Sequence, residues 1–343
     1  MRKLINTLYI TSEDAFLTLD GENVVIKKGK EIAGRFPLHT LESIITFSYQ
    51  GATPAFMGKC AEENIGLFFF SPRGKFLAKT VGRSQGNVLL RKEQYRISDD
   101  LEKSCQYARN MILGKVFNCR WCLERTIRDH SYRVNAERLK KVSLELYEGL
   151  KKIRNVPDMD ALRGIEGELA LRYFSVYDEL IINQKNTFSF DGRTKRPPRD
   201  RVNALLSFAY TMLASDCANA LESVGLDSYV GFMHRDRPGR RSLALDLMEE
   251  LRAVLGDRFV LTLINQKIMK EEYFYIQNDQ AVLLNEEGRR QFLASWQAHK
   301  REAITHPFLK EKIEWGLVPY VQALLLARTI RGDLEEYPPF MWK

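Results

Sequence analysis

The chain has 343 residues, with 52 lysines and arginines against 44 aspartates and glutamates, which gives a formal net charge of +8. Hydrophobic residues make up 45% of the chain, so a globally disordered protein is excluded and about two domains are expected. The longest apolar runs, at 65–70 and 323–327, fall far short of the roughly 18 residues that a membrane-spanning helix needs. Polar residues interrupt the N-terminal segment and the five cysteines are an odd number. Both observations indicate a cytoplasmic protein rather than a secreted one.

The first 85 residues are predicted to form a small β-rich domain. Strands are expected at 15–19, 23–28, 44–47, 65–70 and 75–80. The turn sequence Asp20-Gly21 between the first two is typical of a β-hairpin. Thr53-Pro54 predicts the start of a short helix, because threonine caps helix N-termini and proline suits the first helical position. The pattern changes near 82–87, where we place the domain boundary.

Residues 86–343 are predicted to form a larger, mostly α-helical domain. Apolar residues between Leu139 and Ile153 recur every three or four positions, which is the period of an amphipathic helix. Helix starts are expected near Ser98, Asp158, Asp200 and Asn285, the last helix at 313–331, and a short hairpin at 273–284. The predicted fold class is therefore α+β with two domains, a β-rich domain at 1–85 and a helical catalytic domain at 86–343 with a small inserted hairpin.

Glu166 is predicted to lie on an apolar helix face. It follows Leu162 by four residues and precedes Leu169 by three, so the helical period directs its carboxylate towards the core. A buried carboxylate is costly unless a cation accompanies it. Two interpretations follow, an ion pair with Arg163 or Arg172, or a metal ligand.

A second group of acidic residues lies in the apolar segment 242–255. Asp246 and Glu249 are three residues apart, so they share one helix face, and Glu250 follows them. His234 precedes this helix by a short basic loop, from which it can fold back over that face. A histidine with two or three carboxylates in a helical setting suggests a divalent metal site, with Mg²⁺ favoured by the oxygens and Mn²⁺ by the imidazole. Such a site supports phosphodiester chemistry by activating a water or a sugar hydroxyl for in-line attack.

Two basic clusters accompany these carboxylates. The first contains Arg193, Lys195, Arg196, Arg199 and Arg201, and the second contains Arg235, Arg237, Arg240 and Arg241. Guanidinium groups bind phosphate oxygens bidentately, so we expect nucleic-acid contacts. Two solvated loops are the alternative.

The cysteine pair Cys119 and Cys122 has the spacing of a zinc or redox motif. The chain has no second such pair, and a helical pattern surrounds this one, so we interpret both residues as structural helix cysteines. His39, His130, His299 and His306 show no ligand spacing and are expected to be structural or surface residues.

Three of these motifs together resemble a known family, the universal CRISPR-associated spacer-acquisition integrase, whose subunit is called an endonuclease. The segment Leu162-Arg-Gly-Ile-Glu166-Gly167, followed by Tyr173-Phe174, is similar to the first metal motif of that family. Arg196-Pro-Pro-Arg-Asp200 with Asn203-Ala-Leu-Leu-Ser207-Phe208 is similar to its second signature. Gly231-Phe-Met-His234, with the helix through Arg252, is similar to its third. The resemblance covers essentially the whole chain, and the particular residues within its motifs are similar to those of the type I-C branch.

The resemblance implies roles for individual residues. Glu166, His234 and Glu249 match the metal-binding residues of the catalytic centre, with Mg²⁺ or Mn²⁺ as the cofactor. Asp246 matches a nearby catalytic-site acid of supporting role. Asn203 and the segment 196–201 fall in a motif that lines the active site, which implies DNA positioning.

The resemblance also implies an assembly and a reaction. A homodimer would form through the β-rich domain, and two such dimers would bridge a dimer of a small companion adaptation protein in a heterohexamer. This complex would insert a short duplex into a CRISPR array, its 3′-hydroxyls attacking the repeat ends by transesterification. Two alternatives stay open: a hydrolytic metal-dependent nuclease acting on branched or single-stranded nucleic acid, and a basic DNA-binding scaffold with an inert acidic pocket.

Overall fold

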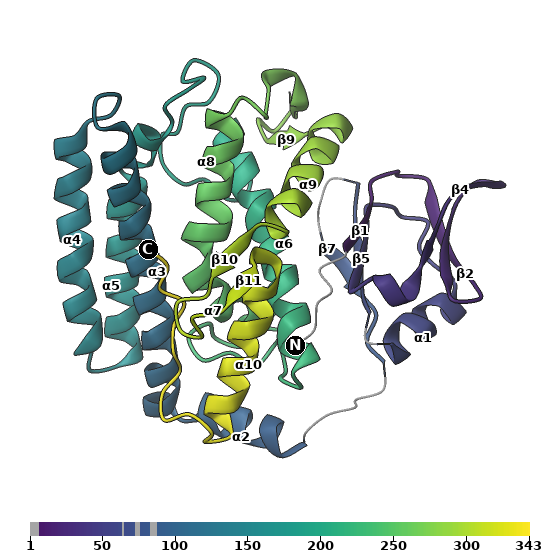
Figure 1. Ribbon diagram of the computed structural model, residues 1–343, viewed down its shortest axis with the longest axis horizontal. Coiled ribbons are helices and arrows are strands. Elements are labelled where there is room, and N and C mark those ends of the chain that lie inside the picture. The colour runs from purple at the N-terminus through teal and green to yellow at the C-terminus, as the bar shows by residue number, and fades with distance from the viewer. Residues whose placement is uncertain (1–6, 64, 73–75, 83–87) are drawn as a thin grey trace. The chain divides into compact units, whose positions relative to one another are not determined.

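The computed structural model describes residues 7–63, 65–72, 76–82 and 88–343 (Figure 1). The chain divides into two compact units. The first unit comprises Met1–Gly86 and Leu284–Arg301, and the second comprises Asn87–Leu283 and Glu302–Lys343. Helix α9 (Glu286–Lys300) therefore groups with the first unit, although the sequence placed it in the helical domain. The boundary expected between residues 85 and 86 lies outside the described residues.

The first unit contains two small sheets and helix α1 (Pro54–Glu62). One sheet has the order β1-β5-β6-β7, with β1 (Thr7–Ile10), β5 (Ser43–Thr46), β6 (Gly66–Phe70) and β7 (Phe76–Lys79). In this sheet β5 pairs in parallel with both β1 and β6, whereas β6 and β7 are antiparallel. The other sheet is an antiparallel meander of β2 (Ala15–Asp20), β3 (Asn23–Lys28) and β4 (Glu31–Pro37). Apolar side chains from both sheets and from α1, Leu17, Ile44, Phe56 and Leu67 among them, form one buried core.

The second unit is mostly helical. Its helices are α2 (Val88–Asp99), α3 (Leu101–His130), α4 (Ala136–Arg154), α5 (Met159–Phe174), α6 (Arg201–Ser223), α7 (Ser242–Leu251), α8 (Arg258–Asn265) and α10 (Val318–Ile330). The long helix α3 packs against α4, α5 and α7, as Figure 1 shows for α3, α4 and α5. The strands β8 (Phe274–Ile276) and β9 (Val282–Leu284) form the two-stranded insertion that the sequence predicted. The predicted α+β fold class with a β-rich region before a helical domain is thus confirmed.

Helix starts follow the predicted capping residues in four cases. Thr53, Asp158, Asp200 and Asn285 each accept a backbone hydrogen bond as the N-cap of a helix. The helix start expected near Ser98 lies two residues later, because Ser98 belongs to the last turn of α2 and the N-cap of α3 is Asp100. The last helix begins at Val318, later than expected, because Lys312–Glu314 pairs with Ala303–Thr305 as strands β11 and β10.

The acid-bearing helix after His234 is not uniformly α-helical. A π-helical segment, Arg252–Asp257, joins α7 to α8. Such widened turns often occur at functional sites, because they redirect side chains relative to a regular helix. None of the described helices is long and apolar enough to cross a membrane.

Candidate metal and nucleic-acid site

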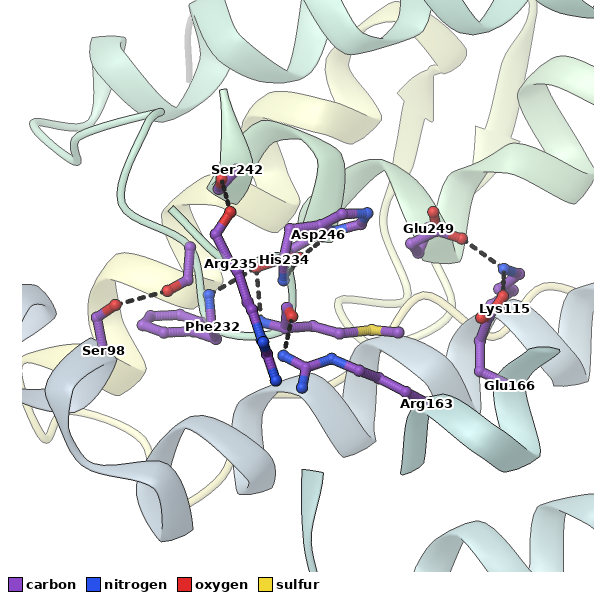
Figure 2. Close-up of polar contacts among 12 residues, drawn as sticks. Ser98, Lys115, Arg163, Glu166, Phe232, His234, Arg235, Ser242, Asp246 and Glu249 are labelled. Atoms are coloured by element: carbon purple, nitrogen blue, oxygen red, sulfur yellow. Dashed lines mark hydrogen bonds and ion pairs between the residues drawn. The ribbon is translucent and has the colours of Figure 1, made fainter. Parts of the chain in front are cut away.

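Two carboxylates predicted as metal ligands approach each other across helix α3. Glu166 is on α5 and Glu249 is on α7, and both helices pack against α3. The side chain of Lys115, from the middle of α3, lies between them (Figure 2). Its Nζ forms an ion pair with Glu166 Oε1 and lies 2.6 Å from Glu249 Oε2. The three side chains are 9%, 20% and 7% exposed for Lys115, Glu166 and Glu249.

The charge of Lys115 is maintained despite its burial. Desolvation disfavours the ammonium, but the negative charges of Glu249 and Glu166 outweigh this effect and raise the pKa of Lys115. The sequence offered Arg163 and Arg172 as ion-pair partners of Glu166, and this was wrong. Arg163 pairs with Asp160, and Arg172 pairs with a glutamate of α4.

Glu249 has a second cationic partner. Arg252 Nη1, from the π-helical segment, donates to Glu249 Oε1 at 2.7 Å. Burial alone would raise the pKa of Glu249, but the charges of Arg252 and Lys115 overcome it and hold that pKa well below its usual range. Glu249 is therefore ionised, as a metal ligand must be. The two acids Glu166 and Glu249 and the two bases Lys115 and Arg252 together form a group with a formal charge of zero.

Asp246 binds the loop that carries His234. Its Oδ2 accepts from the backbone N–H groups of Phe232 at 2.6 Å and Met233 at 3.0 Å. Its Oδ1 accepts from the backbone N–H of His234 at 3.0 Å, and lies 2.5 Å from His234 Nδ1. A carboxylate acceptor at this distance favours the neutral tautomer with its proton on Nδ1, which leaves the Nε2 lone pair for a ligand. Asp246 is thus a positioning residue, with both oxygens used within the protein.

The donor set fits a divalent cation. Among the residues that the structure describes, no three His, Cys, Asp or Glu side chains are gathered closely enough to hold a metal ion. A cation, the ammonium of Lys115, nevertheless lies between two of the expected ligands, and Glu249 Oε2 makes no hydrogen bond of good geometry. By donor type, the carboxylates of Glu166 and Glu249 with Nε2 of His234 would make a mixed oxygen and nitrogen set that suits Mn²⁺ and accepts Mg²⁺.

The second arginine cluster lines a cleft beside these ligands. This cleft of about 460 Å³ is lined by Asp160, Arg163, Glu166, Met233, His234, Arg235, Arg237 and Arg240. Arg163 is fixed there, since it also donates to the carbonyl of Met233 at 2.6 Å. Four guanidinium groups against two acids make the cleft suitable for an anion such as a phosphate. Arg241 is not among the lining residues, and burial lowers its pKa.

The first cluster is largely used inside the protein. Arg193 donates to Asn203 Oδ1 at 2.6 Å and to Ser207 Oγ at 3.1 Å. Arg199 donates to a backbone carbonyl at Asp279, and Arg201 pairs with a glutamate. Lys195 and Arg196 are exposed.

Asn203 corrects the expectation of a DNA contact. Its side chain is fully buried. Its Oδ1 accepts from Arg193 and from the backbone of Thr194, and its Nδ2 donates to Gly192 O and Asp200 Oδ2. These four bonds satisfy the amide, so Asn203 holds the loop at 192–200 onto α6 and has no atom left for DNA.

The other motifs are structural. All five cysteines are free and buried, which agrees with the interpretation of Cys119 and Cys122 as helix residues. Glu250 turns away from Glu249 and accepts from Gln322 Nε2 at 2.9 Å, from the Tyr337 hydroxyl and from the Phe340 backbone at 2.8 Å. Burial raises the pKa of Glu250 to about 7.

Comparisons with known proteins show which family has a similar sequence and fold. A family model described as CRISPR associated protein Cas1 matches residues 8–298. A CRISPR-associated endonuclease Cas1 from Rhodospirillum rubrum is 46% identical to this chain over 347 residues, and one from Chlorobaculum tepidum is 43% identical over 343 residues. Each match covers 100% of this chain and 100% of the relative. The fold is shared with a casposase bound to an integration product, at a TM-score of 0.85, 21% identity and coverage of 99% of this chain and 95% of the other. The chain therefore belongs to the Cas1 family of CRISPR-associated proteins.

Proposed function

We propose that this chain is a divalent-metal-dependent DNA endonuclease and integrase of CRISPR adaptation, which inserts short duplexes into a CRISPR array. The observation that carries the proposal is the juxtaposition of Glu166 and His234 with Arg235, Arg237 and Arg240 around one cleft. Two expected ligands of a cation and three hydrogen-bond donors for a phosphate therefore line the same cleft. The names of the curated relatives, both CRISPR-associated endonucleases, support this proposal.

The protein groups in this centre have distinct roles. Glu166, Glu249 and His234 would hold Mg²⁺ or Mn²⁺, which supplies Lewis-acid polarisation of a phosphoryl oxygen when bound. Asp246 keeps the proton on Nδ1 of His234, so Nε2 stays available as a ligand. The arginines of the cleft bind the DNA backbone and keep the scissile phosphate beside the ligands.

The attacking group distinguishes an integrase from a nuclease. In the integrase, the 3′-hydroxyl of a captured duplex attacks the repeat by transesterification; in a hydrolytic nuclease, water attacks. The casposase with the same fold is bound to an integration product, which favours the hydroxyl. From family membership we also propose a homodimer formed through the β-rich region and a heterohexamer with a small companion adaptation protein. A place in the type I-C branch is a further proposal, which rests on the motif residues alone.

A paired substitution on α5 tests the proposal. Glu166→Gln removes a ligand charge, whereas Glu168→Gln changes an exposed acid two residues later on the same helix. Cleavage and joining of branched DNA in Mn²⁺ should fall at least 100-fold in Glu166→Gln, in line with the loss of an essential group, and stay unchanged in Glu168→Gln. Equal activity of both variants, or activity that EDTA does not abolish, would contradict the proposal.

A further inference from the structure

Lys115 is a charged side chain at the centre of the site that the proposed chemistry does not use. Its ammonium lies between Glu166 and Glu249 and is 9% exposed. Met111 and Ile112, which precede Lys115 by four and three residues on α3, are also buried. A lysine is rarely buried to this extent, because transfer of its charge from water is costly unless acids compensate it.

The two acids would also be unfavourable without Lys115. Carboxylates that share a partly dehydrated space repel each other, and one of them takes up a proton or moves away. Arg252 compensates the charge of Glu249 from one side only, because its Nη1 donates to Glu249 Oε1 at 2.7 Å. Lys115 contacts both acids, so its charge offsets their repulsion and holds them close together.

A divalent cation requires the same oxygens. Glu166 Oε1 and Glu249 Oε2, the atoms that contact Lys115 Nζ, face the space between the two carboxylates. Two cations cannot share these oxygens at contact distance without strong repulsion. The ammonium must therefore withdraw when a metal ion is ligated there.

We propose that Lys115 is a built-in counter-ion of the metal site, which holds Glu166 and Glu249 in the metal-free protein and competes with the divalent cation for them. This inference rests on the metal site in the proposed function. Exchange of the ammonium for a divalent ion turns a formally neutral group into one with a charge of about +1. The loaded site then attracts a DNA phosphate more strongly than the metal-free site does, so Lys115 couples metal binding to DNA affinity.

The test compares two lysine substitutions. Lys115→Met removes the ammonium and keeps an aliphatic side chain of similar length. Lys59→Met is the matched control, because Lys59 on α1 also contacts two acids, Glu22 and Glu63, each at 2.9 Å, outside the site. Thermal unfolding in EDTA and in saturating Mn²⁺ is measured for both variants and wild type, together with the Kd for Mn²⁺ by calorimetry.

The expected result is specific to metal. In EDTA, Lys115→Met should melt below wild type, and Mn²⁺ should raise its Tm by more than it raises that of wild type. Its Kd for Mn²⁺ should be about tenfold lower or more, since removal of a competing contact worth even about 1.4 kcal/mol changes affinity tenfold. Lys59→Met should lower the Tm equally in both conditions and leave the Kd unchanged.

Other outcomes overturn the inference in distinguishable ways. If Lys115→Met binds Mn²⁺ as wild type does, or more weakly, Lys115 is an ordinary structural ion pair and the proposed function stands. If wild type binds no Mn²⁺, and Glu166→Gln therefore changes nothing, the metal site and this inference both fail.

A measurement on wild type covers the case in which Lys115→Met does not fold. Acetylation of lysine amines is followed by mass spectrometry with and without Mn²⁺. Modification of Lys115 should rise when Mn²⁺ releases the ammonium from the acids, while that of Lys59 stays constant. Labelling of Lys115 that does not respond to Mn²⁺ would contradict the proposal.

Discussion

Asp246→Asn is the substitution whose effect the geometry defines best. The carboxylate has no exposed surface, and it accepts four hydrogen bonds, two at each oxygen. Asparagine has the same shape but only one acceptor oxygen. If that oxygen keeps the backbone bonds of Phe232 and Met233, the amide NH₂ faces His234.

Two consequences follow at His234. The backbone N–H of His234 meets another donor and loses its bond, which for a charged acceptor is worth about 1.5–3 kcal/mol. The ring can accept from the new amide only if its proton moves from Nδ1 to Nε2, and Nε2 is then no longer a metal ligand. We therefore expect Asp246→Asn to lower the free energy of unfolding by about 2–4 kcal/mol and to weaken Mn²⁺ binding by about 10–100-fold.

Urea unfolding and Mn²⁺ titration by calorimetry measure the two effects. Asp227→Asn is the control, because Asp227 also accepts a backbone hydrogen bond, from Tyr229 at 2.8 Å, and a bond from the hydroxyl of Tyr95. It should leave the affinity for Mn²⁺ unchanged. An Asp246→Asn protein that folds and binds Mn²⁺ like wild type would refute the assignment of Asp246 as the residue that orients His234.

Three further predictions concern the same unit. Gly231→Ala should lower the Tm, because the new Cβ would lie 2.7–2.9 Å from atoms of Ser242 and Asp246, at a cost of about 1–3 kcal/mol. Gly164→Ala is the control: its Cβ would lie in open space on α5, and the change should stabilise the protein by up to about 1 kcal/mol. The pKa of Glu250 is raised from 4.5 to about 7, so between these pH values the folded state keeps a proton that the unfolded state has lost. The free energy of unfolding should therefore fall by about 3 kcal/mol between pH 4.5 and 7. Urea unfolding at several pH values should show this fall in wild type and not in Glu250→Gln. Arg237→Ala should reduce the salt dependence of DNA binding by about one phosphate contact, and an unchanged slope in a salt titration would exclude it from the interface.

Local sequence patterns predicted much of the fold. Thr53, Asp158, Asp200 and Asn285 were recognised as caps because a short polar side chain before an apolar helix acts on its own neighbours. Strand β4 was not predicted, because most of its residues are exposed and it lacks an alternating apolar pattern. The parallel pairing of β5 with both neighbours depends on contacts between distant segments, which local patterns do not encode.

The candidate site was also identified from local patterns. Glu166 and Glu249 stood out because acidic groups interrupt apolar helical segments, and His234 because it precedes the second of these segments by a short basic loop. Lys115 carries the same signal, three residues after Ile112 and four after Met111, and the periodicity argument used for Glu166 would have found it. Its pairing with both acids could not be predicted, because it joins three helices that are distant in the sequence.

One assay tests directly whether a 3′-hydroxyl or a water molecule attacks the phosphate. Purified protein in Mn²⁺ is given a supercoiled plasmid with a repeat array and a short duplex that ends either in a 3′-hydroxyl or in a 3′-deoxy terminus, with and without the companion protein. We predict joined products only with the 3′-hydroxyl, and none with His234→Ala, whereas His130→Ala should behave like wild type. Cleavage that proceeds equally with the blocked terminus, without joined products, would contradict the account and identify a hydrolytic nuclease.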